Sequence, residues 1–497
     1  MKNTLLNSLI EDNNYKNTEN GAIALKSTLN AVYDLFALGG AYRNRPDDDC
    51  IYLFKKAFEA DPILALKCLF YLRDIRGGGQ GERRFFKVCF NWLAKEYPEV
   101  AFRNIDNVPE YGRWDDLYVL IGSPLEADIF DFMHSQLVKD VYSCDKGEKE
   151  GVSLLAKWLK SENASSLETK KLANITRKHF HLSHKAYRQI LSKLRKRINI
   201  VETLMSQGRW DEIEFEKLPS KAGLIYSNAF AHNDITAAKY EAFVNSKETK
   251  VNAGTLYPYD IVEKVTKHCG WRGLEIEDTE RAAINKYWAN QIDYLNGADC
   301  KILCVIDTSG SMEGRPINTA IALGMYCAER IKGAFHGYYI SFASRPQLIK
   351  VDGVDFCDKV NRIYQTNLVD NTNLKAVFDL LYDKVTSGAA KAEDLPEKIV
   401  VISDMEIDCN SYWHNDFQRK TDMENMRNKW ANAGLKMPEL VYWNVDARQD
   451  TILESPNEEV TFVSGFSPVI FESILTNKTS IDLMLDKLNS KRYEQVK

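Results

Sequence analysis

Apolar residues recur at helical spacing through most of the first 295 residues. In residues 63–75 they stand three and four positions apart, with Asp61 and Pro62 as a cap and first-turn pair and glycines after them. The same pattern is present at 25–40, 82–98 and 187–205. No strand-like run separates these segments, and no fixed period relates them. The pattern therefore predicts an α-helical N-terminal domain, a HEAT-like or irregular solenoid.

The pattern changes near residue 299, where short and uniformly apolar runs begin to alternate with amphipathic helical segments. Strands are predicted at 302–306, 337–343, 347–351, 398–404, 440–445 and 460–465, and helices at 317–331 and 373–385. Apolar strands alternating with helices are typical of a mostly parallel, doubly wound sheet. The sequence thus predicts an extension over 1–19, the helical domain over 20–295, and a Rossmann-like α/β domain over 299–490.

Oxygen-bearing side chains follow two of the predicted strands. Asp307, Ser309 and Ser311 come directly after the first strand, Asp404 ends another, and Thr372 precedes a helix. In a doubly wound sheet, the carboxyl ends of the strands share one edge, where ligands bind. Carboxylate and hydroxyl oxygens are hard ligands, so these five residues predict a site for Mg²⁺, or for another divalent cation such as Mn²⁺ or Ca²⁺, and not for zinc.

Two of these five residues also fit simpler structural roles. Thr372 also fits a helix N-cap, and Asp404 fits a turn residue at a strand end. Two further acids, Glu406 and Asp408, stand at alternate positions after Asp404. They are interpreted as acids of a surface loop, and a second metal is the alternative.

The DxSxS loop at 307–311, the later Thr372 and the strand-end Asp404 resemble the metal-ion-dependent adhesion site of von Willebrand factor A domains. Segments such as "LFYLRDIRGGGQGER", "VPEYGRWDDL" and "VVISDMEID" resemble an uncharacterised family, cellular and viral, that joins a helical region to such a domain. Its layout is similar to that of the Ro (TROVE-module) ribonucleoproteins. The resemblance implies a cation whose open position accepts a partner's carboxylate or other oxygen anion, and an RNA partner.

Charge is concentrated in one stretch, although the chain carries a net charge of only −5. Residues 151–200 contain twelve Lys and Arg against two Glu. Basic residues interleaved with His and Tyr suit phosphate contacts and base stacking. The predicted RNA-contacting residues are Arg177, Lys178, Lys185, Arg188, Lys193, Arg195, Lys196 and Arg197. The alternative is a solvated helix face. Zinc binding by His179, His181 and His184 is the less favoured reading, because no Cys or acidic ligand lies nearby in sequence.

Several other motifs are incomplete or absent, which argues against several classes of function. The glycine-rich "RGGGQGER" at 76–83 lacks the strand and the lysine of a P-loop, so it is interpreted as an inter-helix turn. No signal peptide, membrane-spanning run or CxxC pair is found, which predicts a cytoplasmic protein, or a virion protein if a virus encodes it. No catalytic motif is evident. We expect a non-enzymatic RNA-binding scaffold that binds single-stranded or small structured RNA. The alternatives are a metal-dependent protein-interaction module and a viral assembly component.

Overall fold

The computed structural model describes residues 14–147, 151–251, 256–270, 273–365, 372–407, 422–453, 460–475 and 478–497. The chain forms two compact units. The first comprises the described residues of 1–68 and 253–490, and the second those of 69–252 and 491–497. Residues 253–295 thus group with the sheet, although the sequence suggests a boundary between 295 and 299. The domain limits expected from the sequence stay a prediction.

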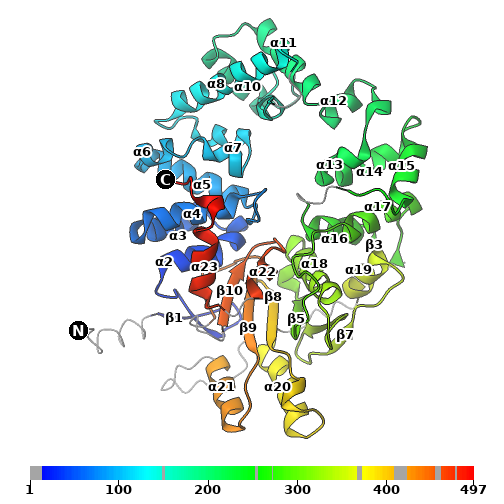
Figure 1. Cartoon of the computed structure of the whole chain (residues 1–497). Helices are drawn as coiled ribbons and strands as arrows, with labels where there is room; N and C mark the ends of the chain where they lie inside the picture. Colours follow the sequence, from blue (N-terminus) through cyan, green and yellow to red (C-terminus); the bar gives the residue numbers. More distant parts are fainter. Residues whose placement is uncertain are drawn as a thin grey trace. The chain divides into compact units, whose positions relative to one another are not determined.

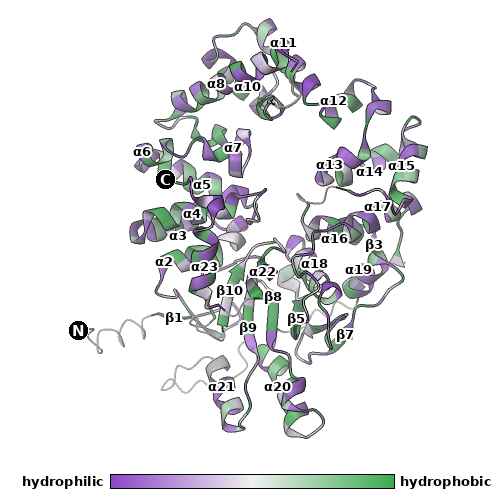
Figure 2. Cartoon of the chain, in the orientation of Figure 1, coloured by the Kyte–Doolittle hydropathy of each residue, from purple (hydrophilic) through white to green (hydrophobic). Residues whose placement is uncertain are grey.

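A six-stranded sheet organises the first unit (Figure 1). Its strands, in spatial order, are β10 (Val460–Ser464), β9 (Glu439–Asn444), β8 (Lys398–Ser403), β5 (Ile302–Asp307), β6 (Tyr338–Phe342) and β7 (Leu348–Lys350). Neighbours from β10 to β6 are parallel, and β7 pairs antiparallel with β6. All six sequence-predicted strands are confirmed. Figure 2 shows the hydrophobic character of β5 and β8, the two central strands.

Close packing of a helix against the sheet depends on a glycine in the segment 317–331. Helix α18 (Arg315–Arg330) follows the DxSxS loop and is buried along most of its length. A Cβ atom added at Gly324 would lie 2.3 Å from Cδ1 of Ile306 on β5. Since real Cβ atoms never approach this closely, only glycine allows the helix to lie so near the strand. The packing holds the middle of α18 against the end of β5.

Segments from both ends of the first unit's sequence complete its structure. A β1 (Tyr15–Asn17) and β2 (Ile23–Leu25) hairpin pairs through Leu25 with Ile452. The remaining helices and short strands are α2 (Ala31–Leu38), α3 (Asp47–Ala60), α16 (Pro258–Thr266), β3 (Cys269–Gly270), β4 (Gly273–Leu274), α17 (Asp278–Ala289), α19 (Phe356–Gln365), α20 (Leu374–Thr386), α21 (Asp422–Asn432), α22 (Ile470–Ile474) and α23 (Ser480–Leu488). Helix α4 (Pro62–Arg73) begins in this unit and ends in the second.

Within its described residues, the second unit consists of helices and loops and contains no strand. Its helices are α5 (Arg83–Glu96), α6 (Pro98–Phe102), α7 (Asn107–Tyr111), α8 (Glu126–Asp145), α9 (Leu155–Trp158), α10 (Leu167–His179), α11 (His184–Arg197), α12 (Val201–Ser206), α13 (Ser220–Ile225), α14 (Ser227–His232) and α15 (Ala237–Asn245). Buried aromatic rings hold its first part together, as where Phe70 packs against Phe86 and Phe90. The expected helical N-terminal region is therefore confirmed.

One helix prediction was wrong. The sequence predicted a single helix over 187–205, whereas the chain forms α11 and α12 with a break at residues 198–200. Asn199 has a φ of 51°, in the left-handed region that ends helices, and its amide N–H bonds the Lys196 carbonyl. Asparagine is a weaker stop signal than glycine, so the unbroken helical spacing concealed the break.

Candidate functional site

Four of the five predicted cation ligands lie in one cluster at the carboxyl edge of the sheet. Strands β5 and β8 are parallel neighbours with Ile306 opposite Ile402, so Asp307 lies opposite Ser403 and Asp404 is the next residue after the end of β8. Asp307 is fully buried and Asp404 is 2% exposed. The amide N–H of Ser309 donates to Asp307 Oδ1 at 2.9 Å. The tight turn after β5 therefore folds the DxSxS loop back over the strand end.

Hydroxyl groups link the two carboxylates. The Ser403 hydroxyl donates to Asp307 Oδ2 at 2.5 Å and lies 3.5 Å from Asp404 Oδ1. On the other side, the Ser309 and Ser311 hydroxyls lie 3.0 Å apart, and the Ser311 side chain hydrogen-bonds Asp404. The cluster is thus a continuous set of carboxylate and hydroxyl oxygens. Ser403 was absent from the predicted set, although its place at the end of β8 is a signal the sequence carries.

Thr372 contacts the loop that follows β8. Its side chain is buried, and its hydroxyl donates to the Glu406 carbonyl at 3.2 Å. The N-cap of α20 is instead Asn373, whose side chain accepts from the Ala376 N–H. The alternative role of Thr372 as that helix's N-cap is therefore wrong. No direct hydrogen bond joins Thr372 to the other four residues within the described part of the chain.

The electrostatics of this cluster disfavour two ionised carboxylates. Burial and the nearby Asp404 carboxylate raise the pKa of Asp307 to about 7. Burial also raises the pKa of Asp404. Asp404 Oδ2 is buried and has no hydrogen-bond partner among the described residues. A buried carboxylate oxygen without a donor is costly. Among the described residues no cation forms an ion pair with either acid, although the charge of Arg448 lowers the pKa of Asp404 in part.

The N-terminal segment supports the loop after β8, a contact that the sequence analysis missed. The Glu19 N–H donates to Glu406 Oε2 at 2.6 Å, and the Asn20 side chain donates to the Glu406 carbonyl at 2.7 Å. The Thr18 hydroxyl donates to the Ile407 carbonyl at 2.8 Å. These contacts join residues almost 390 positions apart, so no local sequence pattern predicts them. Asp408, the other acid named with Glu406, lies outside the described residues.

The basic segment separates into cations used by the fold and cations facing solvent. Arg195 donates to the carbonyls of Ala156 and Leu159 and to the Ser161 hydroxyl, at 2.7 to 2.8 Å. Arg177 pairs with Glu162 at 3.2 Å, Lys193 pairs with Asp145, and Arg197 donates to the Gly147 carbonyl. The exposed cations without an ion pair or hydrogen bond among described residues are Lys178, Lys185, Arg188 and Lys196.

The three histidines of this segment do not form a metal site. His179 stacks on Phe130 with ring centroids 4.2 Å apart and pairs with Glu126, whereas His184 bonds Glu162. Across the described residues, no group of three or more His, Cys, Asp or Glu side chains is placed to hold a metal. That result concerns clusters of those four residue types, and it leaves open a site built from two carboxylates and hydroxyls.

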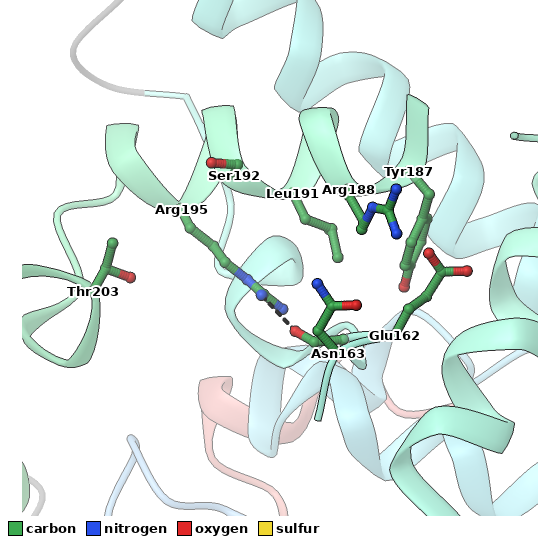
Figure 3. A pocket seen from close by; sticks show the side chains of 9 residues that line it. Glu162, Asn163, Tyr187, Arg188, Leu191, Ser192, Arg195 and Thr203 are labelled. Carbon is green, nitrogen blue, oxygen red and sulfur yellow. Dashed lines mark hydrogen bonds between the residues drawn. The ribbon is translucent and has the colours of Figure 1, made fainter. Parts of the chain in front are cut away.

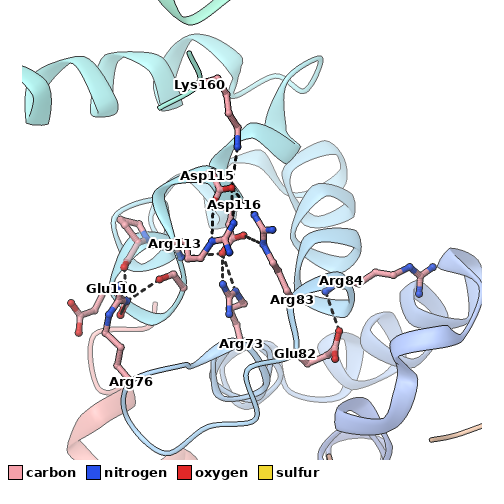
Figure 4. A network of polar contacts seen from close by, with 12 residues as sticks. Arg73, Arg76, Glu82, Arg83, Arg84, Glu110, Arg113, Asp115, Asp116 and Lys160 are labelled. Atoms are coloured by element: carbon pink, nitrogen blue, oxygen red, sulfur yellow. Dashed lines mark hydrogen bonds and ion pairs between the residues drawn. The ribbon is translucent and has the colours of Figure 1, made fainter. Parts of the chain in front are cut away.

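The glycine-rich loop at 76–83 connects α4 to α5, as its interpretation as a turn requires (Figure 4). Arg76 donates to the carbonyls of Pro109, Glu110 and Gly112 at 2.7 to 2.9 Å. Arg83 pairs with Asp116 at 2.5 Å and with Asp115 at 3.0 Å. Both arginines therefore hold neighbouring protein segments in place.

Comparison with known proteins places the chain in a family. A family model described as a domain of unknown function (DUF2828) matches residues 18–150 and 152–299, more than half of the 497 residues. The chain belongs to the DUF2828 family. A second model, also a domain of unknown function (DUF7788), matches residues 301–496, which include the sheet-edge cluster of this DUF2828 protein.

Two individual proteins are similar over most of the chain. Uncharacterized protein L728 of Acanthamoeba polyphaga mimivirus is 28% identical over 502 residues, covering 92% of this chain and 84% of that protein. The crystal structure of the Deinococcus radiodurans RO (RSR) protein aligns with a TM-score of 0.45 and 13% identity, covering 94% of this chain and all of that one. Among the helices that the structure describes, none has the length and apolarity needed to cross a membrane.

Proposed function

We propose that this protein is a non-enzymatic binding protein that holds a divalent cation at the carboxyl edge of its sheet. The observation that carries the proposal is Asp404 Oδ2, a buried carboxylate oxygen without a donor beside the buried Asp307 carboxylate. A cation there would satisfy both acids at once. The ligands would be Asp307, Ser309, Ser311, Thr372 and Asp404, as the resemblance to the von Willebrand adhesion site implies.

The donor set fits a hard cation. It offers carboxylate and hydroxyl oxygens and no thiolate or imidazole, which favours Mg²⁺, Mn²⁺ or Ca²⁺ over zinc. Two carboxylates leave such an ion short of a full oxygen shell. The bound cation would supply an electrophilic position for an oxygen anion of a partner. We propose binding and not hydrolysis, because two-metal nucleases need several carboxylates converging on a pair of ions.

Calorimetric titration of the metal-free protein with Mg²⁺, Mn²⁺ and Ca²⁺ tests this proposal. We expect one site, and a gain in stability of about 2.7 kcal/mol when the cation stands at 100 times its Kd. The variant Asp404→Asn should lose both. The control Asp352→Asn removes an exposed carboxylate that pairs with Arg362 and should bind the cation normally. A protein that gains no stability from any of the three ions refutes the proposal.

RNA binding is the second candidate, and the exposed cations of α10 and α11 favour it. Lys178, Lys185, Arg188 and Lys196 have no ion pair or hydrogen bond among the described residues, so their charges are available to phosphates. Fluorescence anisotropy with single-stranded RNA at several salt concentrations measures this. Affinity that is independent of salt would remove the candidate. Chelator-sensitive capture of a protein that survives ribonuclease would instead favour a protein partner at the sheet edge.

A further inference from the structure

The second unit contains a pocket of about 350 Å³ between residues 161–163 and helix α11 (Figure 3). Leu191 and Tyr187, both buried, give it apolar walls, and Asn163, Ser192 and Arg188 add polar groups. The volume falls within the range of small-molecule sites. Apart from Leu191 and Tyr187 the lining residues are polar or charged, so the pocket suits a polar ligand with one apolar face.

The Glu162 carboxylate is the unusual feature of this pocket. Its side chain is 8% exposed. Oε1 lies 2.7 Å from His184 Nδ1 and 3.2 Å from Arg177 Nε. Oε2 is buried and has no hydrogen-bond partner among the described residues. Figure 3 shows the side chain reaching toward Tyr187 and Arg188 on α11. The carboxylate therefore has partners at Oε1 and an unmatched acceptor at Oε2, which a ligand with a suitable donor could satisfy.

The two arginines of the pocket have different roles. Arg195 is committed to the loop, since its guanidinium donates to Leu159, Ala156 and Ser161. It therefore shapes the wall of the pocket. Arg188 is exposed and makes no hydrogen bond or ion pair within the described part of the chain. The pocket thus combines an acceptor in need of donors, an apolar wall for a flat ring, and a free cation.

We propose that this pocket binds a guanine nucleotide of single-stranded RNA. The base would donate its N1–H and 2-amino hydrogens to Glu162 and pack on Leu191, and its phosphate would pair with Arg188. Adenine and cytosine offer only an amino group, and uracil only an imino hydrogen between two carbonyls, so guanine matches a carboxylate best. The exposed Lys185 on the same helix favours a polyanion over a free amino acid. The inference rests on the RNA-binding candidate and specifies its base preference.

Calorimetry with free nucleotides tests the pocket independently of RNA. We expect guanosine 5′-monophosphate to bind about tenfold more tightly than inosine 5′-monophosphate, which lacks the 2-amino donor, because a hydrogen bond to a charged group is lost. Adenosine and uridine monophosphates should bind more weakly still. Equal binding of the four nucleotides, or binding of none of them, overturns the proposal. So does binding of a free amino acid such as glycine in their place.

Two variants assign the roles within the pocket. Glu162→Gln should abolish the preference for guanine over inosine, while Glu168→Gln, an exposed acid in the first turn of α10, should keep it. Arg188→Gln should weaken every nucleotide several-fold and leave the unphosphorylated guanosine unchanged. Lys139→Gln, an exposed cation on α8, is its control. If Glu162→Gln does not fold, as judged by circular dichroism, the guanosine–inosine comparison on the native protein still decides the question.

RNA titrations then separate this inference from the function on which it rests. Eight-residue RNAs with one guanine, or inosine in its place, should differ by the same factor of about ten. RNA that binds without this difference overturns the pocket inference and leaves RNA binding intact. A preference for guanosine 5′-monophosphate without measurable RNA affinity would support the pocket inference and refute the RNA-binding candidate.

Discussion

Two pairs of buried carboxylates in this protein have opposite electrostatic surroundings. Asp115 and Asp116 in the second unit are surrounded by cations, at distances of 2.5 to 3.1 Å from Arg73, Arg83, Arg113 and Lys160 (Figure 4). Asp307 and Asp404 at the sheet edge meet serine hydroxyls and backbone N–H groups instead. Both pairs are nearly inaccessible to solvent. The first pair forms ion pairs with four cations of the chain, whereas the second forms none among the described residues and is influenced only by the charge of Arg448 on Asp404.

The pKa directions express this difference. Burial alone would raise the pKa of Asp115, but Arg113, Arg83 and Lys160 lower it well below its ordinary value. At the sheet edge, burial and the neighbouring acid raise the pKa of Asp307 to about 7. A buried acid with built-in cations stabilises the fold. A buried acid pair without cations lowers stability unless something outside the chain supplies the charge. This contrast is why the sheet edge, and not the Asp115–Asp116 network, is the better candidate for a cation site.

The largest effect is expected from breaking the matched pair. Arg73 is 2% exposed, and its guanidinium lies 2.7 Å from Asp116 Oδ2. Replacing it by an apolar side chain of similar length, Arg73→Met, leaves a buried carboxylate short of a partner and should lower the free energy of unfolding by about 3–5 kcal/mol. Urea denaturation measures the change. Lys139→Met, at an exposed position of α8, should stay within about 0.5 kcal/mol of the native protein.

The same substitution in the two pairs should have opposite signs. Without divalent cations, Asp307→Asn removes a buried charge that faces Asp404, so stability should rise by about 1–2 kcal/mol. Asp116→Asn removes a charge that holds Arg73 and Arg83, so stability should fall by at least as much. Both are read from denaturation in the presence of chelator. Destabilisation by both variants would show that the sheet-edge acids are as well matched as those of the network.

Acid should weaken the matched pair. Because the folded-state pKa of Asp115 is depressed, its stabilising contribution is present above the unfolded value near pH 4 and is lost as pH falls through the lower, folded-state pKa. Between pH 5 and pH 2, Asp115→Asn should therefore lose less stability than the native protein, by about 1 kcal/mol or more. Parallel curves for the two proteins would show that Asp115 is not stabilised as an anion.

Much of the sheet could be predicted from the sequence, because short apolar runs and amphipathic helices are local signals. The position of Asp307 and Asp404 at one edge follows from parallel strands. The support given to Glu406 by Glu19 and Asn20 could not be predicted, because it depends on pairing between distant segments. The same holds for the cations that surround Asp115 and Asp116.

The basic segment shows a second limit of sequence patterns. Arg195 and Arg188 are the same residue type seven positions apart on one helix, and the spacing assigned them one role. In the structure, Arg195 donates to backbone carbonyls and Arg188 faces solvent. The difference depends on which acceptors each side chain meets: Arg195 reaches the carbonyls of Ala156 and Leu159, whereas Arg188 reaches no acceptor among the described residues. A charge pattern alone therefore cannot distinguish a structural arginine from one available to a ligand.

Substitutions that test this distinction should have the smallest effect on stability and the most specific effect on RNA binding. Lys178→Gln and Lys185→Gln should each change the free energy of unfolding by less than about 0.5 kcal/mol, because neither side chain has an ion pair or hydrogen bond among the described residues. Each should reduce the slope of log affinity against log salt for single-stranded RNA by about 0.7, one phosphate contact.

Arg195→Gln should instead lower stability by about 1–3 kcal/mol, since it leaves buried carbonyls without donors. Its salt slope should match that of the native protein at temperatures where both are folded. If Arg195→Gln reduced the slope while the lysine variants did not, the assignment of fold-forming and solvent-facing cations would be reversed.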